Sequence, residues 1–308
     1  MVSRGMPKPN PGRLPISRVF ESRTHSTHRV AIDRGVRRLG HGIAGFGVAV
    51  VFLMPLYWMV VAALREPGLA PPRTVEWWPV APHWDNFASL FRLLPMQRYL
   101  SNTLIVVAVA VPVTWLTASW AGFGLAMVHD PARRILLTLS VGLMMVPGAS
   151  VWLFRYQILR WMGLNDTLWA LILPSVAATN PLFVLLFYWT FQRVPAGLYD
   201  SAWLDGASVF AVWRKIGCPL ARPATVAVII LAFSFYWSDF VGPVLYLFRP
   251  RWYTLPVGLQ ILKQMDATNW PMLMAAATLA TLPVIVVFVW SLWHLLGRRS
   301  MAEVWERY

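Results

Sequence analysis

The chain has 308 residues, of which 57% are apolar or aromatic and 13% are charged, about half the share of roughly 25% that is typical of soluble globular proteins. So few charges cannot cover the surface of a water-soluble fold of this length, which argues strongly against a cytosolic enzyme. The formal net charge of +14 could indicate a nucleic-acid binder, but the apolar excess favours a membrane protein with basic inner loops.

Residues 1–42 precede the first apolar stretch and are rich in Arg, Ser, Pro and Gly. The apolar run that follows is too long for a signal peptide and shows no small-residue cleavage site. A mitochondrial presequence is compatible with the composition, but we interpret these residues as a disordered cytoplasmic tail. Residues 299–308 are expected to form a second, short cytoplasmic tail.

Six stretches are long and apolar enough to cross a bilayer core of about 30 Å as helices. They are Ile43–Leu64, Leu104–Val128, Ile135–Phe154, Thr167–Phe191, Ala224–Phe248 and Met272–Leu296. They do not alternate polar with apolar residues, as the strands of a membrane β-barrel do. The sequence therefore predicts an all-α membrane protein in which six transmembrane helices form one domain over residues 43–298.

Each of these stretches contains proline, which removes a backbone hydrogen bond and kinks a helix. The prolines are Pro55, Pro112, Pro147, Pro174, Pro181, Pro243 and Pro283. They fit ordinary irregularity of membrane helices, and they equally fit a bundle that encloses a cavity and must flex.

The distribution of basic residues predicts the orientation. If the N-terminus lies inside, 18 of the 27 Lys and Arg residues fall on the inner side, so both termini are expected in the cytoplasm. The longest outer loop, 65–103, carries Trp77, Trp78 and Trp84, followed by the amphipathic stretch Asn86–Leu100. This pattern predicts a helix that lies on the membrane surface with tryptophan anchors.

Several sets of catalytic and cofactor-binding residues are missing from the sequence. There is no GxxxxGK[ST], HExxH or GxSxG motif, and the six histidines lack metal-ligand spacing. The one cysteine, Cys218, cannot form an intramolecular disulfide or a thiolate metal cage. We therefore expect no cofactor, no metal and no catalytic residues, and a membrane-bound enzyme is disfavoured.

The inner loop 192–223 carries the most specific pattern. Pro195 suits a helix start, Gly206 permits a sharp backbone turn, and Pro219 ends a second amphipathic turn. This predicts two short helices around a glycine, with an apolar face that has no core of its own. Such a face either docks into a groove on a partner or lies on the membrane as a simple connector.

This loop resembles the EAA motif of binding-protein-dependent ATP-binding-cassette (ABC) importers. The motif is EAA, three residues, G, nine residues, I-x-L-P, and both spacings are kept. The matching residues are Asp200, Ser201, Ala202, Gly206, Ile216 and Pro219, with Asp for Glu, Ser for Ala and Cys218 for Leu as departures. The string Asp205-Gly206-Ala207-Ser208 is similar to the DGAS of the carbohydrate branch.

Two further segments are similar to that branch. Trp237-Ser238-Asp239-Phe240 with Pro243 resembles its W-x-[ND]-F-x-x-P segment, and Asn102-Thr103 resembles its Asn-Ser. The C-terminal residues depart, because 301–308 lack the Gly-rich tail common in maltose-type permeases.

The resemblance implies a sugar permease subunit in the plasma membrane of a prokaryote, with no enzymatic activity of its own. The loop 192–223 would lie in a cleft of an ATPase subunit, with Asp200, Ser201, Ala202, Asp205, Gly206, Ile216 and Pro219 as coupling residues. The implied partners are two ATPase subunits, a second homologous permease, an extracytoplasmic binding protein and membrane lipid, with no nucleic acid. The alternatives are a permease of the same class for another solute and an ion-coupled secondary transporter.

Candidate solute-path residues are Asn180, Tyr236, Trp237 and Asp239. On a continuous fifth helix, Tyr236, Asp239 and Pro243 share one face, and Asn180 lies near the midplane just before Pro181. A carboxylate at this depth must face water or a partner. It either fixes the packing of helices or lines a polar path for hydroxyl-bearing solutes.

Overall fold

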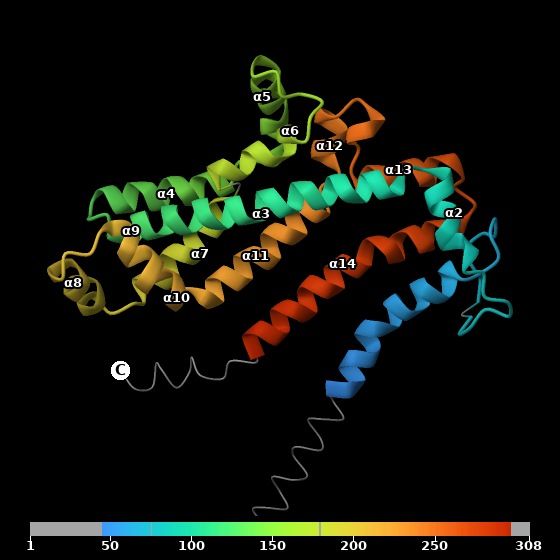
Figure 1. Ribbon diagram of the computed structural model, residues 1–308, viewed down its shortest axis with the longest axis horizontal. Coiled ribbons are helices and arrows are strands. Elements are labelled where there is room, and N and C mark those ends of the chain that lie inside the picture. Colours follow the sequence, from blue (N-terminus) through green and yellow to red (C-terminus); the bar gives the residue numbers. More distant parts are fainter. Residues whose placement is uncertain (1–44, 75, 179, 297–308) are drawn as a thin grey trace, which may run out of the picture. The chain divides into compact units, whose positions relative to one another are not determined.

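The computed structural model describes residues 45–74, 76–178 and 180–296 (Figure 1). The predicted tails, 1–42 and 299–308, lie outside these ranges. Contacts divide the chain after Trp58 into two units. The first unit contributes most of the helix Gly45–Ala63, and the second unit contains every element from α2 onward.

The regular elements of the described residues are all helices, which agrees with the predicted fold class. After the helix Gly45–Ala63 they are α2 (Asp85–Leu93), α3 (Met96–Met127), α4 (Ala132–Met144), α5 (Gly148–Trp161), α6 (Trp169–Ile172), η1 (Leu173–Ala177), α7 (Pro181–Gln192), α8 (Ala196–Leu204), α9 (Val209–Val212), η2 (Trp213–Gly217), α10 (Cys218–Leu220), α11 (Arg222–Trp237), α12 (Val241–Tyr246), η3 (Pro250–Trp252), α13 (Leu255–Met265) and α14 (Trp270–Leu296).

Four helical stretches are long and apolar enough to span a membrane, and two bent helix pairs raise the possible number of spans to six. The four are Gly45–Ala63, Met96–Met127, Trp169–Gln192 and Trp270–Ser291. The predicted stretches Ile43–Leu64, Leu104–Val128, Thr167–Phe191 and Met272–Leu296 overlap with these four, whereas Ile135–Phe154 and Ala224–Phe248 are divided between separate helices.

The surface helix predicted over Asn86–Leu100 is also wrong in its bounds. α2 ends at Leu93, Leu94 is extended with ψ 152°, and α3 begins at Met96. Pro95 explains the division, because the residue before a proline is pushed out of the helical region. Residues 96–100 are the first turn of the long helix α3.

The third apolar stretch is divided into α4 and α5, whose axes differ by 97°. The break lies at Pro147, which is extended with ψ 128° and directly precedes α5. Proline disfavours a helical residue before it, and it has no N–H to continue the hydrogen-bond ladder.

The fourth stretch is interrupted before α7. Ala178 has a left-handed backbone with φ +56°, and the Asn180 side chain accepts a hydrogen bond from the Leu182 amide at 2.9 Å, capping α7. Pro181 occupies the first position of α7, where a missing N–H leaves no intrahelical bond unmade. The expectation that Pro181 removes a backbone hydrogen bond from within a helix is therefore wrong.

The fifth stretch ends its main helix, α11, at Trp237 and resumes as α12 at Val241. Asp239 causes part of this break, because its Oδ1 accepts a hydrogen bond from the Gly242 amide at 3.0 Å. Short polar side chains compete in this way with helical backbone bonds. Tyr236, Asp239 and Pro243 consequently do not share one face of a continuous helix.

α3 is the central helix of the second unit, and it packs most extensively against α7 and then against α11 (Figure 1). Gly122 permits the close approach of α7, since a Cβ there would lie 2.6 Å from Phe187 Cβ and 2.8 Å from the Val184 carbonyl oxygen. At the start of α3, the Asn102 amide donates to the carbonyls of Arg251 and Tyr253, both at 2.9 Å.

Candidate functional site

A cavity of about 730 Å³ lies among the broken helices, and its wall includes residues of the predicted solute path. Its walls come from the α4–α5 bend, α6 and η1, the start of α7, the end of α11, and α12. Three of the four predicted path residues, Asn180, Tyr236 and Asp239, line it. The helix breaks bring them together, although the predicted continuous helix does not exist.

Each of the three side chains also forms a hydrogen bond with another part of the protein. Asn180 and Asp239 cap α7 and α12, as described above. The Tyr236 hydroxyl shares a hydrogen bond with the Thr114 hydroxyl of α3 at 3.2 Å. These residues can therefore both stabilise the helix packing and line the path. One polar atom of a side chain can form the hydrogen bond within the protein while its other hydrogen-bonding sites face the cavity.

Trp237 is not part of the cavity wall. Its ring is buried and stacks on Phe233 with ring centroids 5.4 Å apart, and its indole N–H donates to the Ala280 carbonyl of α14 at 3.0 Å. Trp237 thus joins α11 to α14. This position does not agree with the prediction that Trp237 lines the solute path.

Arg155 and Tyr246 also line the cavity, although neither was predicted from the sequence. Arg155 lies on α5, one residue beyond the predicted third stretch, and its charge acts on both Asp239 and the Tyr246 hydroxyl. Tyr246 donates a hydrogen bond to the Trp152 carbonyl at 3.3 Å. The signal that could have found Arg155 is its position next to an apolar stretch that contains a helix-breaking proline.

Beside the cavity, Asp166 ties the loop before α6 to the end of α12. Its carboxylate accepts the amides of Phe248 and Arg249, both at 2.9 Å, and pairs with the Arg249 guanidinium. Burial acts to raise the pKa of Asp166, but these amides and the guanidinium outweigh it and hold the pKa below its usual 3.8. Asp166 is therefore ionised at neutral pH and fixes the two loops to each other.

The loop 192–223 forms the predicted pair of helical segments around Gly206. The prediction that Pro219 ends the second segment is wrong, because that segment runs from Val209 to Leu220 and Pro219 lies in the first turn of α10, where its missing N–H is tolerated. Gly206 has φ +76°, its amide donates to the Trp203 carbonyl at 3.0 Å, and the Ala207 amide donates to the Ala202 carbonyl at 3.0 Å. These two bonds are the Schellman arrangement that ends a helix with a left-handed residue. The Ser208 side chain then accepts the Ala211 amide and caps α9.

The first half of this loop presents most of its surface to solvent. Asp200, Ser201, Asp205 and Gly206 are exposed, whereas Ala202, Ile216 and Pro219 are half-buried. Leu204 is 89% exposed, which is unusual for a large apolar side chain in a connector.

Tyr199 anchors α8 to the bundle. Its ring packs edge-on against Phe123 of α3, with centroids 6.0 Å apart, and burial raises its pKa to about 12. The second half of the loop is held by Trp213, which is buried and packs edge-on against Trp120 at 5.0 Å. The exposed apolar tip of the loop is therefore held to α3 by two aromatic contacts.

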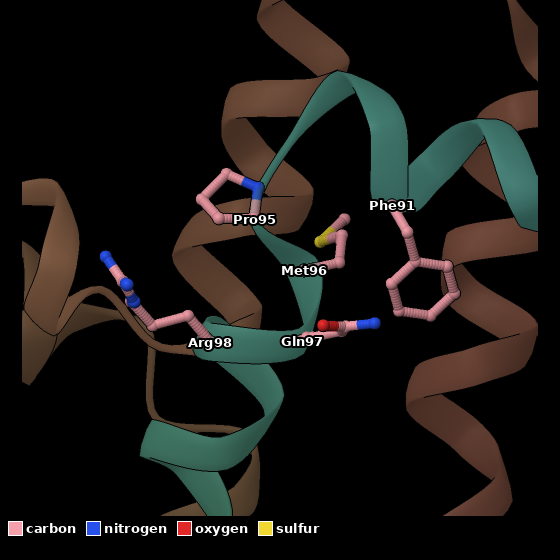
Figure 2. A pocket seen from close by; sticks show the side chains of 5 residues that line it. All are labelled: Phe91, Pro95, Met96, Gln97 and Arg98. Atoms are coloured by element: carbon pink, nitrogen blue, oxygen red, sulfur yellow. The ribbon is translucent and has the colours of Figure 1, made fainter.

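A smaller hollow of about 300 Å³ lies at the turn between α2 and α3 (Figure 2). Phe91, Pro95, Met96, Gln97 and Arg98 line it. The Phe91 ring and the Gln97 amide lie on one side of the turn, and the Arg98 side chain extends to the other (Figure 2). None of the predicted site residues belongs to it. Among the described residues no cluster of His, Cys, Asp and Glu could hold a metal ion.

Comparison with known proteins gives one matching family. Residues 87–299 match the family described as the inner membrane component of binding-protein-dependent transport systems. The chain is 29% identical over 243 residues to the probable ABC transporter permease protein YurM of Bacillus subtilis, covering 78% of this chain and 79% of that protein. It is 27% identical to the sulfoquinovosyl glycerol transport system permease protein SmoH of Agrobacterium fabrum, covering 77% and 83%.

The fold is also found among solved structures. A chain of a bacterial ABC transporter involved in the import of the acidic polysaccharide alginate superposes with a TM-score of 0.66 at 18% identity, covering 83% of this chain and 95% of that one. The broken helices described above therefore belong to a fold that occurs in an ABC importer.

Proposed function

Because the chain belongs to the family of inner membrane components of binding-protein-dependent transport systems, we propose that it forms half of the translocation path for a sugar. It is a multi-pass plasma-membrane permease of an ABC importer, and ATP hydrolysis takes place on a separate subunit. The named solutes of its relatives, such as sulfoquinovosyl glycerol and alginate, support a carbohydrate. Ion-coupled transport, the alternative from a different class, is disfavoured by this family membership.

The observation that carries this proposal is the polar cavity at the helix breaks. Asn180, Tyr236 and Asp239 present amide, hydroxyl and carboxylate groups to a hollow within an otherwise apolar bundle. Groups of this kind exchange hydrogen bonds with sugar hydroxyls. Helix ends that meet at a cavity are also the places where irregular backbone is tolerated inside a membrane protein.

The exposed tip of the loop 192–223 is the proposed contact with the ATPase subunit. Asp200, Ser201, Asp205 and Gly206 are exposed there beside the apolar side chain of Leu204. Ala202, Ile216 and Pro219 support this tip from within the loop. Closure of the ATPase pair on binding ATP would move the tip as a rigid body and switch the access of the cavity.

The complete importer in this proposal holds two ATPase subunits, a second homologous permease and an extracytoplasmic binding protein. In this proposal the chain crosses the membrane six times with both termini in the cytoplasm, and the loop 192–223 lies on the ATPase side. The bent pair α4–α5 counts as one broken span, and α11 with α12 forms the fifth.

Co-purification with the ATPase subunit tests the coupling surface. Leu204→Glu should weaken the contact roughly tenfold or more, because burial of a leucine side chain contributes about 1.5–3 kcal/mol. The matched control is Val80→Glu, which replaces a fully exposed apolar residue in the loop before α2. Full recovery of the ATPase with Leu204→Glu, together with normal sugar uptake, would exclude this surface.

A further inference from the structure

Arg155 is the only positively charged side chain among the described residues that line the cavity. It is half-buried on α5, and it faces the same hollow as Asn180, Tyr236 and Asp239. The apolar stretch that carries α5 is long enough to cross the bilayer only as part of the α4–α5 pair. A half-buried guanidinium needs water, a polar partner or an anion to offset its loss of hydration.

Asp239, the one carboxylate in the cavity wall, does not neutralise Arg155 by direct pairing. Its Oδ1 is already engaged by the Gly242 amide at 3.0 Å. In the part of the chain that the structure describes, Arg155 forms no ion pair with a carboxylate within 4.0 Å. The Arg155 guanidinium hydrogen-bonds the Tyr246 hydroxyl, and its charge acts on Asp239 from a distance. A guanidinium has five N–H donors, so those not used by Tyr246 can serve a solute.

The chemistry of the guanidinium indicates what that solute carries. Its planar fork of N–H donors matches the two oxygens of a carboxylate, sulfonate or sulfate, and such charge-assisted pairs are about twice as strong as neutral hydrogen bonds. Sugar hydroxyls alone do not balance a desolvated cation. We propose that Arg155 recognises an oxyanion on the transported sugar, so that the importer takes an acidic saccharide. This inference rests on the proposed function of the cavity as the solute path.

Protection of a cysteine in the cavity wall tests this proposal even while the natural solute is unidentified. The assembled importer would carry Cys218→Ser, which removes the native thiol, and Ala177→Cys, which replaces a small residue of the cavity wall. The rate of reaction with a maleimide is measured with trigalacturonate and with its methyl ester, which has the same backbone but no charge. Half-protection should need roughly tenfold less of the acid than of the ester, the factor expected for a charged hydrogen bond.

Substitutions at Arg155 show whether this side chain makes the difference. Arg155→Gln should abolish the preference for the acid, and Arg155→Lys should keep part of it because the charge remains although the fork of donors is lost. Arg160→Gln is the matched control, since Arg160 is exposed on the same helix and does not line the cavity. If Arg155→Gln prevents assembly, the Arg155→Lys protein decides: a retained preference supports the proposal, and a lost one overturns it.

Two other outcomes overturn the proposal. One is that, in the protein that keeps Arg155, the acid and the ester protect the cysteine equally or not at all. The other is that adding Asp239→Asn to the Arg155→Gln protein restores protection by the acid, which means that Arg155 only balances the charge of Asp239. ATPase activity stimulated by the binding protein, measured on the same preparation, reports separately whether the proposed function fails.

Discussion

Replacement of Gly206 by valine should uncouple transport from ATP hydrolysis while leaving the bundle in the membrane. Gly206 has φ +76°, and a Cβ added there meets no atom within 4 Å. The substitution therefore removes no packing contact, and its whole effect comes from the backbone. A left-handed conformation costs an L-residue about 1–2 kcal/mol, and more for a β-branched side chain. That free energy lowers the population of the native loop roughly 5–30-fold.

The assay is sugar uptake and ATPase activity of the reconstituted importer, with membrane insertion as the internal control. Gly206→Asn is the matched variant, because asparagine adopts the left-handed conformation several-fold more readily than other non-glycine residues. We expect uptake to fall in the order glycine, asparagine, valine. Normal uptake by Gly206→Val, or a worse result for asparagine than for valine, would refute the backbone argument.

Three further predictions concern packing, pH and the solute path. Gly122→Ala should destabilise the bundle by about 1–3 kcal/mol through overpacking, whereas Gly124→Ala, where a Cβ meets nothing within 4 Å, should keep or raise the melting temperature in detergent because alanine favours a helix more than glycine does. Asp166→Asn should destabilise by about 1 kcal/mol at neutral pH, because the charged bond is lost but partly screened by solvent. Since the folded pKa of Asp166 lies below 3.8, its contribution is complete above that pH and disappears as the pH falls further, so melting temperatures of wild type and variant should converge in acid. Asp239→Leu and Asn180→Leu should lower uptake while the importer still assembles, and unchanged uptake of several sugars would leave these two residues with a packing role only.

Hydropathy and turn residues were sufficient to predict the apolar stretches and the loop around Gly206. A run of about 20 apolar residues has few alternatives to a membrane helix. Gly206 could be predicted because a left-handed backbone between two short amphipathic segments strongly favours glycine.

The breaks within the apolar stretches could not be predicted from hydropathy, because they leave the mean apolar character unchanged. Pro147 divides two helices, whereas Pro112 and Pro283 lie inside continuous ones. Tertiary packing decides between these outcomes, and no pattern in one sequence reports it. Arg155 was missed for a related reason, since the apolar run ends one residue before it. Trp237 was assigned to the path from its neighbours in sequence, although its ring points to α14.

Access to the cavity is the property that tests the assignment of the solute path most directly. In the importer with Cys218→Ser and Ala177→Cys, labelling by a membrane-impermeant maleimide from the binding-protein side should rise severalfold when ATP and vanadate trap the ATPase pair closed. Val80→Cys, at a fully exposed position outside the cavity, should label equally in both states. A rate for Ala177→Cys that is the same with and without trapping would contradict the assignment of this cavity as the alternating solute path.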